Sequence, residues 1–184
     1  MPMFQDLEQF KLPIGFRGRP AVVVQLWWLV EALFFRNSPQ FAYAFRRWLL
    51  RCFGAKIGRR VLLRPTVSIT YPWKLSIGDS SWVGDNVTLY SLGQITVGSN
   101  AVISQGTYVC AADHDYASVD FPIRERPIII EDQTWIAARC FIGPGVIIGA
   151  GAVIGACSTV FGDIPAGMVC LGTPARPVKS REHG

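Results

Sequence analysis

A single histidine lies within the patterned part of the chain, His114 in the run 110–116, CAADHDY. A histidine titrates near neutral pH, so in a cleft it can take a proton from an attacking hydroxyl group and return it to a leaving thiolate. Asp113 or Asp115 could orient its ring. Cys110 suggests a Cys-His nucleophile, but it falls at a turn position of a six-residue repeat, which favours a structural role. Because a lone loop histidine is more often simply solvated, its role depends on the elements that position it.

The composition excludes several classes of protein. The chain has 184 residues, of which 50% are hydrophobic and 17% charged, so it can bury one well-packed domain and is not disordered. The net charge of +5 is not gathered in one dense run, which favours anionic small molecules or lipid headgroups over nucleic acid. His114 and His183 are the only histidines, so no metal site is expected. Five cysteines without CxxC spacing, and no secretory leader, predict a reducing, cytoplasmic location.

The element that must position His114 is a six-residue repeat that begins at Ile57. An aliphatic residue returns every six positions, commonly followed by glycine and, four places on, by a small or β-branched residue. Three such strands would close one triangular coil, and successive coils would stack about 4.8 Å apart with their aliphatic side chains inside. The sequence therefore predicts a parallel β-helix of about five coils. Its fifteen aliphatic positions are Ile57, Leu63, Ile69, Ile77, Val83, Leu89, Val97, Ile103, Val109, Ile130, Ile136, Ile142, Ile148, Ile154 and Val160.

Breaks in the period indicate a working edge. Two extra residues precede Ile77, two precede Val97 and fifteen precede Ile130. All three insertions come before the first strand of a coil, so they lie on one edge of the prism, and the loop 113–127 must project there with His114. Insertions gathered on one face usually mark the binding face. An ordinary antiparallel barrel is the alternative for short apolar runs, but its strands would alternate with period two.

A helical segment, residues 1–56, is predicted before the repeat. Residues 21–35 are almost wholly apolar but too short to span a membrane, and the run 37–39 predicts a stop and a second helix that Gly54 would end. The favoured interpretation is that both helices cap the open first coil. A compatible alternative is an interfacial anchor made of aromatic and basic residues. These residues are Trp27, Trp28, Phe34, Phe35, Arg36, Arg46, Arg47 and Arg51.

Four stretches of the sequence resemble the hexapeptide acyltransferases, and most closely the group of galactoside, maltose and colanic-acid-type O-acetyltransferases. The stretches are 77–87, the His114-Asp115 loop, 135–146 and 163–176, so the resemblance covers most of the chain. It implies an all-β fold, a left-handed parallel β-helix, and a homotrimer whose active sites lie in grooves between neighbouring prisms. The expected division is a helical segment 1–56, a β-helix 57–171 with its loop 113–127, and a basic tail 172–184.

The resemblance also implies roles for single residues. His114 falls on the family's catalytic histidine, and Asn86 and Asp115 are assigned to the acceptor, although a corner asparagine that supports a tight turn explains Asn86 equally well. Small or flat residues would lie against the pantetheine arm of coenzyme A, and two basic residues would meet its nucleotide end. The residues expected to bind coenzyme A are Trp135, Ala138, Ala156, Arg176 and Lys179.

These features together predict an acetyl-CoA-dependent O-acetyltransferase that acts on a sugar hydroxyl in exopolysaccharide or cell-surface glycan biosynthesis. Transfer would be direct, with His114 as base and backbone N–H groups as oxyanion donors. A γ-type carbonic anhydrase would need several histidines for zinc, and an ice-binding β-helix would show ranks of threonine without a protruding loop. An N-acetyltransferase acting on an amino sugar stays open, as does peripheral membrane contact through the helices.

Overall fold

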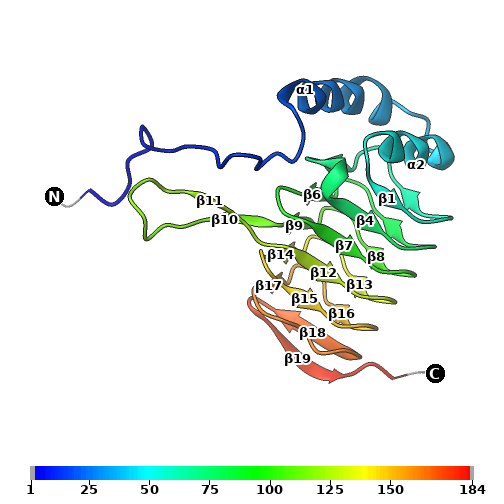
Figure 1. The fold of residues 1–184 in the computed structure, drawn as a ribbon. Helices are drawn as coiled ribbons and strands as arrows, with labels where there is room; N and C mark the ends of the chain where they lie inside the picture. The colour runs from blue at the N-terminus through cyan, green and yellow to red at the C-terminus, as the bar shows by residue number, and fades with distance from the viewer. Residues whose placement is uncertain (1–2, 183–184) are drawn as a thin grey trace.

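The computed structural model describes residues 3–182, so His183 lies outside the described residues. Three parallel sheets form the sides of a triangular prism (Figure 1). Sheet 1 contains β1 (Lys56–Ile57), β4 (Leu75–Ile77), β7 (Ile95–Val97), β12 (Ile128–Ile130) and β15 (Ile147–Ile148). Sheet 2 contains β2 (Leu62–Leu63), β5 (Trp82–Val83), β8 (Val102–Ile103), β13 (Trp135–Ile136), β16 (Val153–Ile154), β18 (Met168–Gly172) and β19 (Ala175–Ser180). Sheet 3 contains β3 (Ser68–Ile69), β6 (Thr88–Tyr90), β9 (Tyr108–Cys110), β14 (Phe141–Ile142) and β17 (Thr159–Val160).

The chain visits the sheets in the order 1, 2, 3, and each pass makes one coil. Five complete coils are followed by a partial sixth, in which Ile164 bridges to Ile148 on sheet 1 and β18 pairs with β16 on sheet 2. The predicted number of coils is confirmed. Equivalent residues pair in register from coil to coil, as in the row Leu62, Trp82 and Val102 on the outer face of sheet 2.

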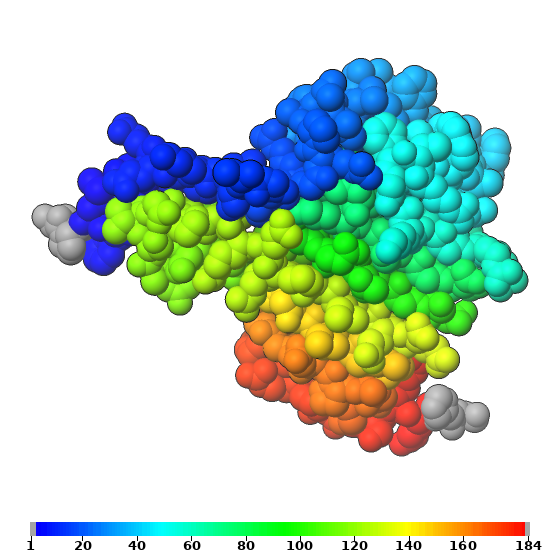
Figure 2. All heavy atoms as spheres, in the orientation of Figure 1, coloured from blue at the N-terminus to red at the C-terminus, as the bar shows by residue number. Residues whose placement is uncertain are grey.

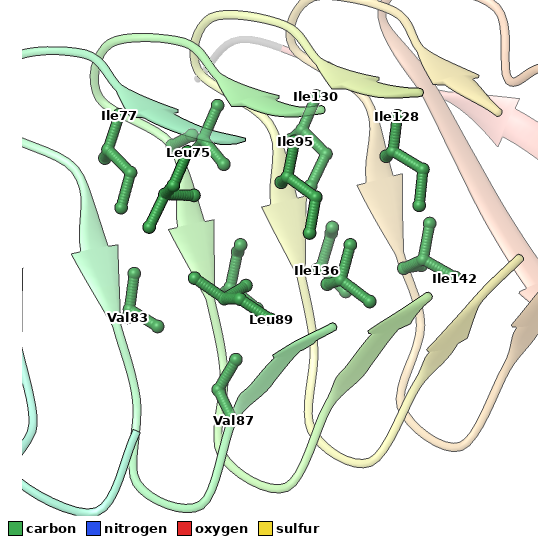
Figure 3. Close-up of a cluster of buried hydrophobic side chains, with 14 of the residues drawn as sticks. Leu75, Ile77, Val83, Val87, Leu89, Ile95, Ile128, Ile130, Ile136 and Ile142 are labelled. Carbon is green, nitrogen blue, oxygen red and sulfur yellow. The ribbon is translucent and has the colours of Figure 1, made fainter. Parts of the chain in front are cut away.

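The core consists of the predicted aliphatic column. All fifteen positions are buried, with exposed fractions of 7% or less. Those labelled in Figure 3, among them Ile77, Val83 and Leu89, point into the prism. The smaller residues four places on are buried as well, and they fill the corners beside the aliphatic side chains. Each coil therefore buries the apolar layer of its neighbours, and only the two end coils need covering.

The three insertions lie on one edge of the prism, between sheet 3 and sheet 1, which is called edge 3–1 here. The first forms a 3-10 turn, η2 (Pro72–Lys74), and the third forms a two-stranded arm, β10 (Ala112–His114) and β11 (Ile123–Glu125). The arm is an antiparallel hairpin in which His114 pairs with Ile123. It projects far from the prism, as predicted for the loop 113–127 (Figure 1).

The N-terminal helices cap the first coil, as the favoured interpretation predicts. α1 (Ala21–Val30) continues into a π-helical turn, η1 (Glu31–Phe35), and α2 (Tyr43–Cys52) follows. Without a cap, the first coil would leave the backbone N–H and carbonyl groups of its three strands without partners. Such unpaired groups are costly when they are buried. On β3, the Ile69 N–H donates to Glu31 Oε1 at 2.8 Å and the Ile69 carbonyl accepts from Trp27 Nε1 at 2.8 Å.

Three arginines of α2 satisfy the other strand edges of the first coil. Arg46, which is fully buried, donates from Nε to the carbonyl of Leu63 at 2.7 Å. Arg47 donates to the carbonyl just before β2, and Arg51 donates to the carbonyl of Ile57 on β1. These arginines were also candidates for lipid headgroups, and that assignment is wrong for Arg46, because its guanidinium bonds only protein oxygens.

Two details of the N-terminal segment differ from the prediction. The second helix begins at Tyr43 rather than at the run 37–39, since Pro39 starts a turn that ends in a hydrogen bond from Ala42 N–H to its carbonyl. Trp27 and Phe35 belong to the core instead of an exposed aromatic set, because both are fully buried under the first coil. Gly54 ends the segment in the left-handed region, with φ of +90°.

The C-terminal residues extend sheet 2. The segment 172–184 was expected to be a basic tail, but β19 pairs antiparallel with β18 and covers the last coil. Within residues 3–182 no helix is long and apolar enough to cross a membrane.

Candidate active site

The arm holds His114 at the end of β10, opposite Ile123 of β11. Its half-buried imidazole ring stacks on the ring of Phe121, with centroids 4.3 Å apart and an interplanar angle of 9°. His114 Nδ1 lies 2.9 Å from the carbonyl oxygen of Phe121. A carbonyl oxygen only accepts hydrogen bonds, so Nδ1 must carry the proton, and the neutral ring presents its lone pair at Nε2. The geometry thus prepares Nε2 to act as a base.

The carboxylates beside His114 have a different role from the one predicted. Arg124 Nε donates to Asp113 Oδ1 at 2.8 Å, and Arg124 Nη1 lies 3.5 Å from Asp115 Oδ2. The expectation that Asp113 or Asp115 orients the ring is therefore wrong, because the Phe121 carbonyl takes Nδ1 and both carboxylates pair with Arg124. Asp115 lies one residue from His114 on the arm, so its assignment to the acceptor stays a prediction.

An N-terminal strap, residues 4–20, runs along the arm and was not predicted (Figures 1 and 2). The Asp6 N–H donates to the carbonyl of Val119 near the tip of the arm at 2.7 Å. Phe10 places its ring 6.1 Å from the ring of His114. The apolar residues of the strap are spaced irregularly in the sequence, so no periodic signal could have revealed this packing.

Lys74 joins the strap, the coil and the arm. Its ammonium group donates to the carbonyls of Phe16 and Leu92 and pairs with Glu125 Oε1 at 2.7 Å. Its side chain is only 13% exposed, so these contacts are sheltered from water. One cation thereby fixes the base of the arm against edge 3–1.

The other predicted site residues lie on a different edge of the prism, between sheet 2 and sheet 3, which is called edge 2–3 here. Asn86, Ala138 and Ala156 all occur in the turns from a sheet 2 strand to a sheet 3 strand, in coils 2, 4 and 5. Hydrogen bonds join successive turns along this edge. In one of them the Cys157 N–H donates to the carbonyl of Ala138 at 2.9 Å. Asn86 has φ of +56°, which suits the turn role, and its side chain is exposed.

Trp135 borders edge 2–3 on the outer face of sheet 2. It is 47% exposed, and its Nε1 donates to Ser104 Oγ at 3.1 Å, so the indole lies along the sheet. Trp135 pairs with Val153 of β16, and Val153 pairs with Val169 of β18. Val169 in turn pairs with Lys179 of β19, so Lys179 lies in the same row of sheet 2 as Trp135. Arg176 is exposed on the same strand as Lys179. The structure thus brings all five residues expected to bind coenzyme A to one side of the prism.

The two groups of site residues flank sheet 3 within one chain. His114 lies beyond edge 3–1, whereas Asn86 and the coenzyme A residues lie on edge 2–3 and sheet 2. Between them, the outer face of sheet 3 carries a row of aromatic rings: Tyr108 stacks on Phe141 at 5.9 Å, and Phe141 meets Phe161 at 5.6 Å. A single chain therefore presents two half-sites on either side of an aromatic face.

Cys110 is not poised as a nucleophile. Burial raises the pKa of its thiol above the usual range, and the thiol donates to the carbonyl of Ala112 at 3.2 Å. A reactive cysteine needs the thiolate form, which burial disfavours. Within residues 3–182, no group of three histidine, cysteine or acidic side chains is placed to hold a metal ion.

Comparisons with known proteins agree with this architecture. The family model "Bacterial transferase hexapeptide (six repeats)" matches residues 127–162, and "Hexapeptide repeat of succinyl-transferase" matches residues 74–111. Over 177 residues the chain is 54% identical to the "Putative colanic acid biosynthesis acetyltransferase WcaF" of Escherichia coli K12, covering 96% of this chain and 97% of that protein. It is 30% identical over 140 residues to the galactoside O-acetyltransferase of the same organism, covering 73% of this chain and 68% of that one.

A solved structure has the same fold. A hexapeptide-repeat acetyltransferase of Vibrio cholerae, crystallised with acetyl coenzyme A, superposes with a TM-score of 0.78 at 28% identity and 88% coverage of each chain. The chain therefore belongs to the hexapeptide-repeat acetyltransferases, and its fold is their left-handed parallel β-helix. Within that class, the 54% identity relates it to the proteins named for colanic acid biosynthesis.

Proposed function

We propose that this acetyltransferase moves an acetyl group from acetyl-CoA to a sugar hydroxyl in the biosynthesis of an exopolysaccharide or cell-surface glycan. The observation that carries the proposal is the fixed tautomer of His114, whose Nδ1–H is held by the Phe121 carbonyl while Nε2 is left as the base. The name of the relative with 54% identity supports the glycan acceptor.

The transfer needs no covalent enzyme intermediate. His114 Nε2 takes the proton of the acceptor hydroxyl, and the oxygen attacks the thioester carbonyl carbon. Backbone N–H groups along the groove stabilise the resulting oxyanion, which is where such donors lower the barrier most. The carbon–sulfur bond then breaks, and the imidazolium returns its proton to the thiolate of coenzyme A.

The donor would lie along edge 2–3. Ala138 and Ala156 expose the backbone of two successive turns, which lets a narrow pantetheine arm approach closely, and the exposed face of Trp135 borders that path. Arg176 and Lys179 on β19 would meet the phosphates of the nucleotide end through charge-assisted contacts.

The two half-sites support a homotrimer. If sheet 3 of each chain faces a threefold axis, edge 3–1 of one chain meets edge 2–3 of the next, and His114 reaches the donor groove of its neighbour. The aromatic row on sheet 3 would then be buried at the centre. The arm, which projects away from its own prism, has the length to cross such a boundary (Figure 1).

Peripheral membrane contact is a further part of the proposal, in a cytoplasmic protein. Val22, Leu26, Leu29 and Leu33 follow helical spacing on α1 and η1 and are 50–73% exposed. Residues 11–64 contain eleven lysines and arginines but a single acid, Glu31, which is buried. An apolar helix face within a basic segment suits the surface of an anionic bilayer.

Replacing His114 with alanine tests the function. Acetyl-CoA turnover, followed by thiol release with a panel of sugars and amino sugars, should fall about 10²–10⁴-fold, while the Kd for acetyl-CoA is retained. Tyr116→Ala, on the exposed part of the same arm, is the matched control and should stay active. Retained turnover in His114→Ala would contradict the assignment. A product that resists mild alkali would be an amide, and would point to the N-acetyl alternative.

A further inference from the structure

A hollow of about 460 Å³ opens on sheet 2 beside edge 2–3, in the first three coils. Its floor is the outer row of sheet 2, where Trp82 stands between Leu62 and Val102. The indole of Trp82 is 55% exposed. Tyr43 of α2 forms one wall, so the N-terminal helices contribute to this hollow as well as capping the prism.

The rim of the hollow is polar and has balanced charge. Arg64 Nε donates to Asp85 Oδ2 at 2.8 Å, and that hydrogen bond lowers the pKa of the Asp85 carboxyl below its usual range. Thr66 Oγ1 donates to the other carboxylate oxygen at 2.9 Å, which fixes the plane of the group. Asn86 and Gln105 add two exposed amides, each of which can donate and accept.

We propose that this hollow binds one pyranose ring of the acceptor glycan, stacked on the face of Trp82. The proposal rests on the proposed function and names the part of the site that holds the acceptor. A pyranose has an apolar face of C–H groups and a rim of hydroxyls. An exposed indole matches the face, and planar amide, carboxylate and guanidinium groups match the hydroxyls.

The charge balance of the rim selects among sugars. Because the Arg64 cation is paired with Asp85, the hollow offers no uncompensated positive charge for a carboxylate or a phosphate. A neutral sugar ring therefore fits it better than a uronic acid or a sugar phosphate.

The hollow adjoins the expected donor groove. Ser104 lines the hollow and accepts the hydrogen bond of Trp135 Nε1, so the two tryptophans border neighbouring stretches of one surface. They lie on the same sheet face in β5 and β13, with Val102 of β8 between them. The acceptor and the thioester would thus lie one after the other along sheet 2, and His114 of a neighbouring chain would reach the point where they meet.

The pair of tryptophans gives a matched experiment. Binding of methyl glycosides of the common neutral hexoses, with methyl glucuronide and inorganic phosphate as anionic probes, is measured by saturation-transfer NMR on the full-length protein without turnover. At least one neutral glycoside should bind to the wild type and to His114→Ala alike. Trp82→Ala should weaken that binding at least tenfold and keep the Kd for acetyl-CoA, whereas Trp135→Ala should do the reverse. Trp82→Phe should recover most of the sugar affinity.

Several results would overturn the proposal. They are the absence of binding by every neutral glycoside, tighter binding of the anionic probes, or unchanged sugar affinity in folded Trp82→Ala protein. A loss of acetyl-CoA affinity in Trp82→Ala would instead assign the hollow to the donor. Since binding is measured without catalysis, loss of turnover in His114→Ala with intact sugar binding keeps the two proposals distinguishable.

Discussion

The imidazole of His114 is positioned by a backbone carbonyl and an aromatic ring rather than by a carboxylate. Phe121 supplies both groups, and it does so with φ of +47°, a left-handed conformation that is uncommon for residues other than glycine. Strain of this kind persists where the surrounding structure holds it in place. The β10–β11 pairing of the arm and the contacts of the strap provide that support.

Substitutions of Phe121 separate its two contributions. Phe121→Gly keeps the left-handed backbone and removes the ring, so kcat should fall about tenfold because the imidazole loses its stacking partner. Phe121→Val disfavours positive φ and displaces the carbonyl, so the loss should be about a hundredfold. Steady-state kinetics measure both, with the Kd for acetyl-CoA unchanged. Equal activity in the valine variant and the wild type would show that the carbonyl does not position His114.

The sequence made His114 the candidate base, which stays a prediction, but it indicated the wrong partner for the ring. Asp113 and Asp115 are its neighbours in the chain, and nothing in their spacing shows that Arg124, ten residues after His114, pairs with both carboxylates. That pairing follows from the hairpin register of the arm, in which Asp113 lies opposite Arg124. The arm has no sequence period that would indicate its hairpin register. The partner of the His114 ring could therefore be found only from the structure.

At the scale of the elements, the cap is built from polar groups directed at strand edges. Glu31 accepts from the N–H of Ile69, and desolvation of its carboxylate outweighs this hydrogen bond and the charge of Arg36. The pKa of Glu31 is therefore raised. The folded protein binds this proton more tightly than the unfolded chain, so the contribution of Glu31 to stability is present at acid pH and is lost as pH rises through the raised pKa.

Two variants of Glu31 test this account. Glu31→Gln keeps an oxygen acceptor for Ile69 without a buried charge, so its Tm should exceed that of the wild type at pH 7, and the difference should vanish near pH 4. Glu31→Ala leaves the Ile69 N–H without a partner and should cost about 1–3 kcal/mol at both values. Thermal melts monitored by circular dichroism measure these differences. A glutamine variant that melts below the wild type at pH 7 would contradict the raised pKa.

The sequence predicted the prism far better than its cap. Every aliphatic position is buried because a stack of identical layers repeats the same environment, and the repeat in the sequence records it. The helical cap contacts only the first coil, so its packing is not repeated. The sequence of the cap therefore has no period from which that packing could be predicted. In α2 the buried side includes Arg46 beside Leu49 and Leu50, while Phe45 and Trp48 are exposed, so burial does not follow hydrophobicity along this helix.

For the whole molecule, the proposed trimer can be tested by disrupting sheet 3. Tyr108→Glu puts a charge into the aromatic row of sheet 3, and it should convert a trimer into monomers without turnover, as measured by light scattering and thiol release. Thr96→Glu, on the outer face of sheet 1, is the matched control and should leave the trimer intact.

As an independent test, mixed trimers of His114→Ala and Ala138→Trp should regain activity that neither variant has alone. No recovery after subunit exchange would place both half-sites in one chain.

The proposed membrane contact can be tested on the proposed trimer. A cyclic trimer would place three caps at one end, so their weak individual contacts would add through multivalency. The wild type should float with vesicles that contain phosphatidylglycerol, and less with phosphatidylcholine alone. Leu26→Glu/Leu29→Glu should remain at the bottom of the gradient, while Ile147→Glu, an exposed apolar position on sheet 1, should float. Flotation of the double variant would reject the contact.

The stack of coils also sets a fixed distance along the prism. Successive coils are about 4.8 Å apart. The three coil steps from Asn86 to Ala156 and the two further strand steps, to β18 and then β19, therefore fix the distance between the sugar hollow and the basic strand. A cofactor arm of one length fits that span. Gaining or losing a single coil would leave the fold stable, since each coil contacts only its neighbours, yet it would move the phosphate anchor one step away from the reacting carbonyl. If coenzyme A lies along edge 2–3 as proposed, its length sets the number of coils.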